Sequence, residues 1–268
     1  MKLTRNEEMT YAAKSIRLDV DEVCYGDLDP EWDIEILRAA FTRIYFITEG
    51  EGILKIGNEC IPLLPNNIYL VPSGLTFSGF CPGALKKIYV HLTVTGPDGS
   101  DLLSGLDRCV VLPDRGDTVN EALRLCKNVS IDSVLKFKLM LYEIINDALK
   151  SHSLNDNRLR KFSMETAAAL EYIDGHLSAS LTIGEIASAL FISRPVLQKS
   201  FRKDLGKPIG RFIDDALRAK AERQLLDPSL SVKEISDGLG YCDQFYFSRK
   251  FTQTHGISPR RFRQMHIG

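Results

Sequence analysis

Two stretches in the last third of the chain share one pattern: Leu181-Thr182-Ile183-Gly184-Glu185-Ile186-Ala187 and Leu230-Ser231-Val232-Lys233-Glu234-Ile235-Ser236. Leu, Glu and Ile coincide in position, and Thr in one copy is matched by Ser in the other. Further along, Phe201 aligns with Phe251 and Gly206 with Gly256 once one residue is inserted in the second copy. The C-terminal region therefore contains an internal repeat, in which each copy is one structural unit.

Each copy predicts a helix, a tight turn and a second helix. Thr182 and Ser231 stand where they can cap the first helix, and Glu follows each of them three residues later, which is the capping-box pattern. Ser193 and Asp243 are expected to cap the second helix. A glycine at residue 206 or 256 is expected to end it.

The units at 181–206 and 230–256 match a helix-turn-helix, whose second helix enters the major groove of DNA. A bridging helix expected at 209–226 has about 17 residues and is roughly 25 Å long. That length can hold two reading helices near one DNA turn apart, about 34 Å. A single helical hairpin is common in proteins, so the DNA-binding interpretation depends on two copies in tandem with basic outer faces.

The second helix of each unit needs an apolar face toward the domain and a polar face toward DNA. The residues expected to point inward are Val196, Leu197, Ser200 and Phe201 in the first unit and Tyr246, Phe247 and Phe251 in the second. The outer side chains include Gln and Arg, which hydrogen-bond to the edges of adenine and guanine. The candidate DNA-binding residues are Arg194, Pro195, Gln198, Lys199 and Arg202, together with Gln244, Phe245, Ser248 and Arg249.

The most distinctive stretch is Gly240-Tyr241-x-Asp243-Gln244-x-Tyr246-Phe247-Ser248-Arg249-x-Phe251, followed by Gly256-Ile257-Ser258-Pro259-x-x-Phe262-Arg263. It resembles the signature of the AraC-type bacterial transcription regulators, and the resemblance covers about 162–264. The departures are small, with Ser236 where Ala is usual and Cys242 where a polar residue is common. The resemblance implies base contacts from the matching positions of the two reading helices, among which Pro195 and Phe245 would make apolar contacts such as with a thymine methyl group.

The region before residue 111 predicts a β-rich domain. Segments at 43–47, 52–56, 68–71 and 88–92 are rich in Ile, Val, Tyr and Phe and are separated by Gly, Pro and Asn clusters. Many short strands with regular turns favour a barrel or a sandwich. Arg43-x-Tyr45, Glu49-Gly50-x-Gly52 and Tyr89-x-His91 loosely resemble the cupin-like sensor barrel of the same family.

We therefore expect an α+β chain of two domains, with an N-terminal cupin-like β-barrel flanked by helices and a C-terminal all-α double helix-turn-helix. The expected boundaries are 1–116 for an effector-binding barrel, 117–151 for a helical dimerisation segment, 152–161 for a linker and 162–268 for the DNA-binding domain. The helical segment has apolar residues on two adjacent faces at spacings of three and four. One face can cover the barrel, and the other predicts a homodimer.

A small-molecule effector is the expected ligand of the barrel, and the resemblance favours a sugar or a related metabolite. The candidate effector-binding residues are Trp32, Arg43, Tyr45, Tyr89 and His91. Arg43 and Tyr45 share one strand face, as do Tyr89 and His91. Aromatic rings with a polar anchor suit a small-molecule pocket, and ordinary packing is the competing interpretation for each residue.

Composition narrows the class of protein. The 268 residues contain no apolar run that approaches the roughly 20 needed to span a bilayer, and MKLTRNEEMT is not a secretory signal, so we expect a cytoplasmic protein with no membrane partner. The six cysteines form no CxxC pair, which favours free thiols. The His-x-His…Glu cluster of metal-binding cupins is absent, and no nucleophile has a placed base. We therefore expect no metal, no cofactor and no enzyme.

Charge is divided unevenly along the chain, whose net charge is −1. From Ser163 onward there are 15 Lys and Arg against 12 Asp and Glu, and before it 19 against 23. The predicted function is a sequence-specific, effector-responsive transcription activator that binds double-stranded DNA and contacts RNA polymerase. The alternatives are a ligand-independent DNA-binding dimer with an empty barrel and a cupin enzyme fused to a DNA-binding domain. A metabolite panel would separate them, because an effector raises the melting temperature whereas an enzyme gives turnover.

Overall fold

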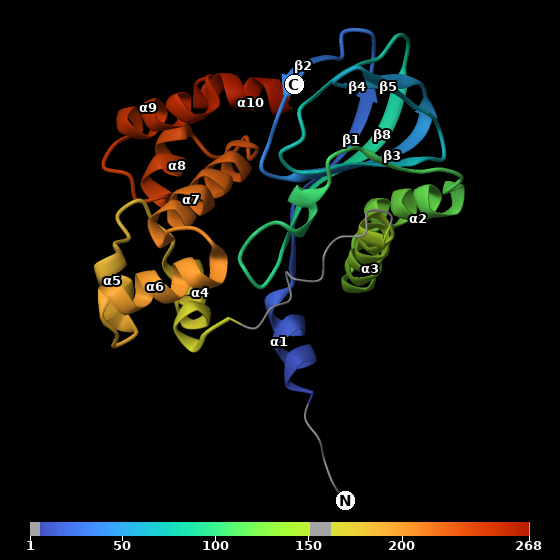
Figure 1. Cartoon of the computed structure of the whole chain (residues 1–268). Coiled ribbons are helices and arrows are strands. Elements are labelled where there is room, and N and C mark those ends of the chain that lie inside the picture. Colours follow the sequence, from blue (N-terminus) through green and yellow to red (C-terminus); the bar gives the residue numbers. More distant parts are fainter. Residues whose placement is uncertain (1–5, 151–161, 268) are drawn as a thin grey trace, which may run out of the picture. The chain divides into compact units, whose positions relative to one another are not determined.

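The computed structural model describes residues 6–150 and 162–267, which form two compact units (Figure 1). The N-terminal unit contains Ile16–Gly96 and continues from Ser100 through its last helix, and the C-terminal unit contains the helices beyond residue 162. A short helix, α1 (Glu7–Ser15), precedes the first strand. The expected linker at 152–161 lies outside the described residues.

Five strands form the larger sheet of the N-terminal unit, in the order β1-β8-β3-β6-β9. All neighbours are antiparallel, and β8 pairs with β1 on one side and β3 on the other. In this register Arg43 lies opposite His91 and Tyr45 lies opposite Tyr89. The strands are β1 (Arg17–Leu28), β3 (Thr42–Gly50), β6 (Ile68–Val71), β8 (Leu85–Thr95) and β9 (Val110–Leu112).

Four strands form the smaller sheet, in the order β2-β7-β4-β5. They are β2 (Asp33–Leu37), β4 (Gly52–Ile56), β5 (Glu59–Leu63) and β7 (Phe77–Phe80). Tyr69 of the larger sheet links the two, because its hydroxyl donates to the Pro62 carbonyl at 2.7 Å and accepts from the Leu64 amide at 2.9 Å.

The α+β class and the two-domain organisation are confirmed, and the expected cupin-like barrel is not closed. No β-ladder joins the two sheets within the part of the chain that the structure describes. The chain leaves β1, turns through Asp29–Trp32 and enters β2 without pairing these two edge strands. The N-terminal unit is therefore a two-sheet sandwich.

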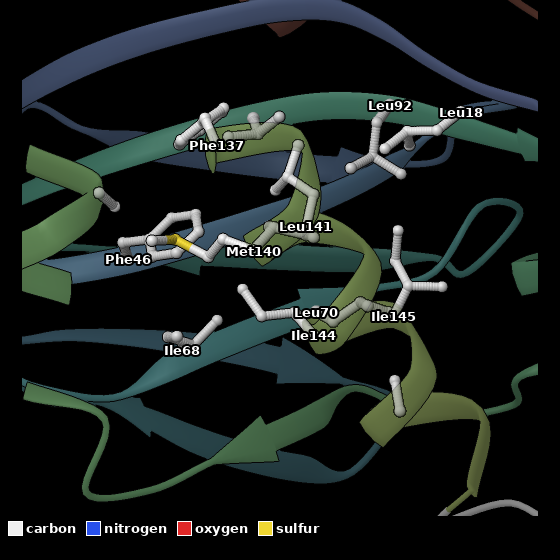
Figure 2. Close-up of a cluster of buried hydrophobic side chains, with 14 of the residues drawn as sticks. Leu18, Phe46, Ile68, Leu70, Leu92, Phe137, Met140, Leu141, Ile144 and Ile145 are labelled. Atoms are coloured by element: carbon white, nitrogen blue, oxygen red, sulfur yellow. The ribbon is translucent and has the colours of Figure 1, made fainter. Parts of the chain in front are cut away.

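The main hydrophobic core lies between the larger sheet and two helices, α2 (Gly116–Lys127) and α3 (Ile131–Lys150). Figure 2 shows α3 directing Phe137, Met140, Leu141, Ile144 and Ile145 at the strands. This spacing of three and four is one face of a helix. Full burial of each such side chain stabilises the fold by about 1.5–3 kcal/mol, so this core fixes α3 on the sheet. The helical region expected at 117–151 is thus two helices, which break at Asn128.

The C-terminal unit is all-helical. Its helices are α4 (Met164–His176), α5 (Ile183–Ala189), α6 (Arg194–Leu205), α7 (Ile209–Leu225), α8 (Val232–Gly238), α9 (Gln244–His255) and α10 (Pro259–Ile267). The two helix-turn-helix pairs are α5–α6 and α8–α9, and α7 joins them (Figure 1). The predicted bridging helix matches α7 to within one residue.

The capping pattern of the two repeats is confirmed with one exception. Thr182 and Ser231 each accept the amide of the Glu three residues later, and that Glu in turn accepts the cap amide. Asp243 caps α9 by accepting two backbone amides, at 2.8 and 2.7 Å. Ser193 occupies the cap position of α6 but makes no side-chain cap bond. Pro195 removes one of the two amides that a cap can reach, so the Val196 amide is the one left for Ser193.

A hydrogen bond between largely buried side chains ties the second helix-turn-helix to α7. His255 Nε2 on α9 lies 2.8 Å from Glu222 Oε1 on α7, and the His255 ring stacks on Phe251. Arg263 on α10 donates to the carbonyls of Leu225 and Leu230, at 2.9 and 2.6 Å, where α7 ends. These bonds fix the C-terminal end of the bridging helix, so α9 is held rigidly relative to α7.

Candidate nucleic-acid interface and candidate effector site

The first reading helix, α6, presents a basic surface. It buries Leu197 and Phe201, and its predicted DNA-binding residues are all exposed: Arg194, Pro195, Gln198, Lys199 and Arg202. It has four basic residues and one acidic residue. That acid, Asp204, accepts the Ser163 amide at 2.9 Å and the Ser163 hydroxyl at 2.5 Å. These hydrogen bonds lower the pKa of Asp204 although burial opposes them, and they hold the carboxylate away from the basic surface.

The second reading helix, α9, has the same layout with less charge. Phe247 and Phe251 are buried, Phe245 and Arg249 are exposed, and Gln244 and Ser248 are half-buried. The helix has no acidic residue, and Lys250 pairs with Asp214 of α7 at 3.0 Å. Arg249 is therefore the charged side chain that α9 offers to a ligand outside the protein.

Two residues expected to point inward do not. Val196 and Tyr246 are 45% and 44% exposed, so their predicted inward orientation is wrong. They occupy equivalent positions in the two repeats, one residue before the buried Leu197 or Phe247. A shift of one residue turns a side chain by about 100° around a helix, which moves both of them to the edge of the buried stripe.

Arg194 has a contact within its own unit. Its guanidinium packs directly over Gly184 of α5, where a Cβ atom would overlap it. The second unit has Lys233 and Gln244 at the equivalent positions. The glycine in α5 therefore makes room for Arg194 beside the first reading helix.

The turn between the two helices adopts the same backbone in both repeats. Phe191 and Gly240 both have a left-handed φ, at 54° and 74°. The amide of the next residue donates to the carbonyl four residues before the turn residue, at 3.0 Å in each copy. This conformation costs an ordinary residue about 1–2 kcal/mol, yet Phe191 is 97% exposed and gains no burial there. The repeat alignment contained this signal, since it placed a Phe opposite a Gly.

The two faces of the larger sheet differ in chemistry. Its outer face, toward α2 and α3, is aliphatic and belongs to the main core. We call the face toward the smaller sheet the inner face. Register and alternation place on it Glu22, Cys24, Arg43, Tyr45, Tyr69, Lys87, Tyr89 and His91. The inner face therefore combines aromatic rings with buried polar groups, whereas the outer face is a conventional apolar core.

The structure brings the predicted effector-site residues together. Arg43, Tyr45 and His91 are buried on the inner face, and Tyr89 is half-buried beside them. Trp32 comes from the turn before β2 and is also buried. Arg43 stacks against the rings of Phe41 and Phe77, at 4.4 and 5.3 Å from the ring centroids. Because Phe77 belongs to the smaller sheet, this contact confirms that the inner face meets that sheet.

His91 and Glu22 form a close pair on the inner face. The His91 Nδ1 atom lies 2.7 Å from Glu22 Oε2, although the angle there is poor for a hydrogen bond. Burial lowers the pKa of His91 to about 4, despite the opposing effect of Glu22. Burial also raises the pKa of Glu22, but contacts with His91 and Cys24 outweigh it and leave that pKa lowered. At neutral pH the pair is thus a neutral imidazole beside a carboxylate.

Lys87 is the central residue that the sequence prediction missed. It is 5% exposed, and its Nζ atom lies 4.0 Å from the Tyr45 ring centroid, 4.2 Å from that of Trp32 and 5.8 Å from that of Tyr89. Burial and, to a smaller degree, the charge of Arg43 lower its pKa to about 7. Alternation with Tyr89 and His91 along β8 was the available signal for its position on this face.

Within residues 6–150 and 162–267, no group of three or more His, Cys, Asp and Glu side chains is arranged to hold a metal ion. None of the helices in the described ranges combines the length and the apolar character needed to cross a membrane.

Comparison with known proteins agrees with this architecture. Residues 186–265 match the family model described as a helix-turn-helix domain. The Msm operon regulatory protein of Streptococcus mutans is 25% identical, over 82% of this chain and 83% of that protein. The lactose operon transcription activator of Staphylococcus xylosus is 23% identical, over 82% of each chain. The arabinose operon regulatory protein of Escherichia coli is 30% identical, over 52% of this chain and 45% of that protein.

Among solved structures, ToxT from Vibrio cholerae has a similar fold. Its TM-score is 0.51 at 13% identity, with 95% of this chain and all of that chain covered. The sequence comparisons place a DNA-binding helix-turn-helix domain at the C-terminus, and the relatives matched over most of the chain are regulators of transcription. The fold comparison shows the two-domain architecture of ToxT. The C-terminal unit is an AraC-type helix-turn-helix domain.

Proposed function

We propose that this regulator inserts α6 and α9 into successive major grooves of one DNA duplex, and that a small molecule bound on the inner face controls the outcome. The observation that carries the DNA proposal is the equivalence of the two reading helices, each with a buried Leu/Phe or Phe/Phe pair and an exposed polar side. The bases would be contacted by Pro195, Gln198, Lys199, Gln244, Phe245, Ser248 and Arg249, with Arg194 and Arg202 near the phosphates.

Selection of bound sequences from random DNA tests this proposal and measures the spacing between the two half-sites. Arg249→Ala should weaken binding by about 1–3 kcal/mol and relax the base preference at one position. Lys127→Ala, which removes an exposed charge from α2, is the matched control and should leave DNA affinity unchanged. An Arg249→Ala protein that selects the same sequences with the same affinity would exclude Arg249 as a base-reading residue.

The second part of the proposal is a homodimer formed through α3. The face of α3 opposite the core exposes Ile131, Leu135, Leu139 and Tyr142, which lie on one stripe at spacings of four, four and three. A second copy presents the same stripe, and such self-complementary contact is the usual basis of a two-fold dimer. Leu135→Glu with Leu139→Glu should convert the protein to a monomer in sedimentation at micromolar concentration. A dimer that survives both substitutions would contradict this interface.

The third part is regulation by a ligand in the cytoplasm. The inner face offers aromatic rings and buried polar groups, which support binding rather than turnover. Two relatives are named for lactose and arabinose operons, which supports a sugar-like effector and activation through RNA polymerase. Addition of effector to the DNA-bound protein should change the footprint or the transcript yield. Transcription from a selected site that never responds to any metabolite extract would favour a ligand-independent regulator.

A further inference from the structure

We propose that the ligand of the N-terminal unit carries an anionic group, a carboxylate or a phosphate, which binds the ammonium of Lys87 on the inner face. This inference rests on the proposed effector function and names the chemistry of its ligand. The Lys87 side chain lies on β8 beside the predicted effector residues.

The first argument is the cost of burying a charge. A buried ammonium is strongly disfavoured unless an anion or hydrogen-bond acceptors compensate it. Within the described residues, Lys87 has aromatic rings around its ammonium and no ion-pair or hydrogen-bond partner. Its neighbour Lys86 shows the ordinary arrangement, since it is exposed and pairs with Glu49 at 2.7 Å.

The second argument concerns the charges that face Lys87. Arg43 on β3 is a second buried cation and disfavours the charged lysine, while Cys81 after β7 has a small opposite effect. Tyr45, Tyr89 and His91 also face it, and none of these carries a negative charge at neutral pH. The Glu22 carboxylate on this face is in contact with His91 and with the Cys24 thiol, and its charge interacts with that of Arg43. The ammonium of Lys87 is therefore the charge that a ligand can neutralise.

The third argument concerns the rest of the ligand. Trp32, Tyr45 and Tyr89 supply flat apolar surfaces next to the ammonium. Such rings pack against the apolar face of a sugar or a similar small ring. A sugar acid or a sugar phosphate combines both features, and the free acid and the phosphate ester share the anionic chemistry.

The test compares matched acidic and neutral probes on the full-length protein. Glucuronate, gluconate and glucose 6-phosphate are each set against glucose in thermal-shift and calorimetric titrations, and inorganic phosphate reports the anion alone. Lys87→Met removes the charge while keeping most of the side-chain volume, and Lys86→Met is the control on the same strand. We expect an acidic probe to raise the melting temperature of the wild type and of Lys86→Met. Its affinity should fall at least roughly 30-fold in Lys87→Met, the factor expected when one partner of a buried charge pair is lost.

A second measurement needs no ligand: the melting temperature of the protein alone. Without ligand, Lys87→Met should melt above the wild type at pH 6, because it no longer buries the ammonium. Two results would overturn the inference: a neutral probe that binds as well as its acidic partner in both proteins, or a Lys87→Met protein that melts below the wild type and shows no acid-dependent shift. DNA affinity of Lys87→Met without ligand is measured in parallel. Its loss would point to a failure of the regulator as a whole rather than of the anion site.

Discussion

Replacing Lys87 with methionine should make the stability of the N-terminal unit less dependent on pH. The folded protein holds the pKa of Lys87 at about 7, against an ordinary value of 10.5. Between these two pH values the unfolded chain binds the proton that the folded chain has released, so stability rises with pH. The penalty from the buried charge is fully present below pH 7 and is lost as the pH rises toward 10.5. Methionine has no such penalty at any pH.

The structure sets the size of this effect. A depression of about 3.5 pKa units at 1.36 kcal/mol per unit corresponds to about 5 kcal/mol at pH 6. This pKa is the net result of all interactions of the ammonium, so the nearby rings of Tyr45 and Trp32, at 4.0 and 4.2 Å, do not offset the cost of burial. Lys87→Met should therefore be more stable than the wild type at pH 6, by up to about 5 kcal/mol. The gap should narrow as the pH rises from about 7 toward 10.

Urea unfolding followed by tryptophan fluorescence measures this difference in the free energy of unfolding for the N-terminal unit. Trp32 is the only tryptophan of the chain and lies against Lys87, so its emission reports the unfolding of the sandwich. Wild type, Lys87→Met and Lys86→Met are compared between pH 6 and pH 9.5, and other titrating groups cancel in the differences. A gap that stays constant with pH, or a Lys87→Met protein that is less stable at pH 6, would refute the reasoning from desolvation.

Two further perturbations test the C-terminal unit. Phe191→Gly should raise its melting temperature by a few degrees, since it relieves about 1–2 kcal/mol of left-handed strain at a fully exposed side chain. Gly240→Ala at the equivalent turn should lower it, because a Cβ there is strained and also overlaps the Ser178 hydroxyl. A Phe191→Gly protein that melts below the wild type would contradict the strain at this turn. Glu222→Ala should destabilise this unit by about 1–3 kcal/mol in calorimetry, because it removes the buried hydrogen-bond partner of the His255 ring. Asp214→Ala, which breaks an exposed pair with Lys250, is its control and should cost no more than about 1 kcal/mol; similar losses for both would show that burial is not the deciding factor.

The features predictable from the sequence are those that local chemistry decides. The capping boxes of α5 and α8 involve residues three apart, and the stops at Gly206 and Gly256 need only a left-handed φ. The two apolar faces of α3 were also predictable, because the spacing of apolar residues within one helical segment shows which of them share a face. Two local predictions were wrong. The cap bond expected from Ser193 depends on the proline in the first turn, and the inward orientation expected for Val196 depends on where the buried stripe of the helix ends.

The features that the sequence did not reveal depend on contacts between distant segments. Lys87 is surrounded by aromatic rings for two reasons. The register of β8 on β3 places it beside Tyr45, and the turn before β2 places Trp32 over it, although Trp32 lies far from Lys87 in the sequence. Barrel closure likewise depends on whether two edge strands pair, and β1 and β2 do not. The strand β1 was missed because its inner-face residues, Glu22, Cys24 and Gly26, make it read as polar. On the proposed function, that polarity is what a ligand-binding face requires.

Successive side chains of β3 point alternately to the proposed ligand site and to the core under α3, so this strand connects the two. Arg43 and Tyr45 point to the inner face, and Ile44 and Phe46 between and after them belong to the core under α3. The Phe46 ring lies 6.4 Å from that of Phe137 on α3, and Figure 2 shows both in the same layer of side chains. Close-packed cores transmit small displacements because they contain few voids. On the proposed function, a ligand that displaced Tyr45 would also displace the surface on which α3 packs, and the opposite face of that helix is the proposed dimer contact.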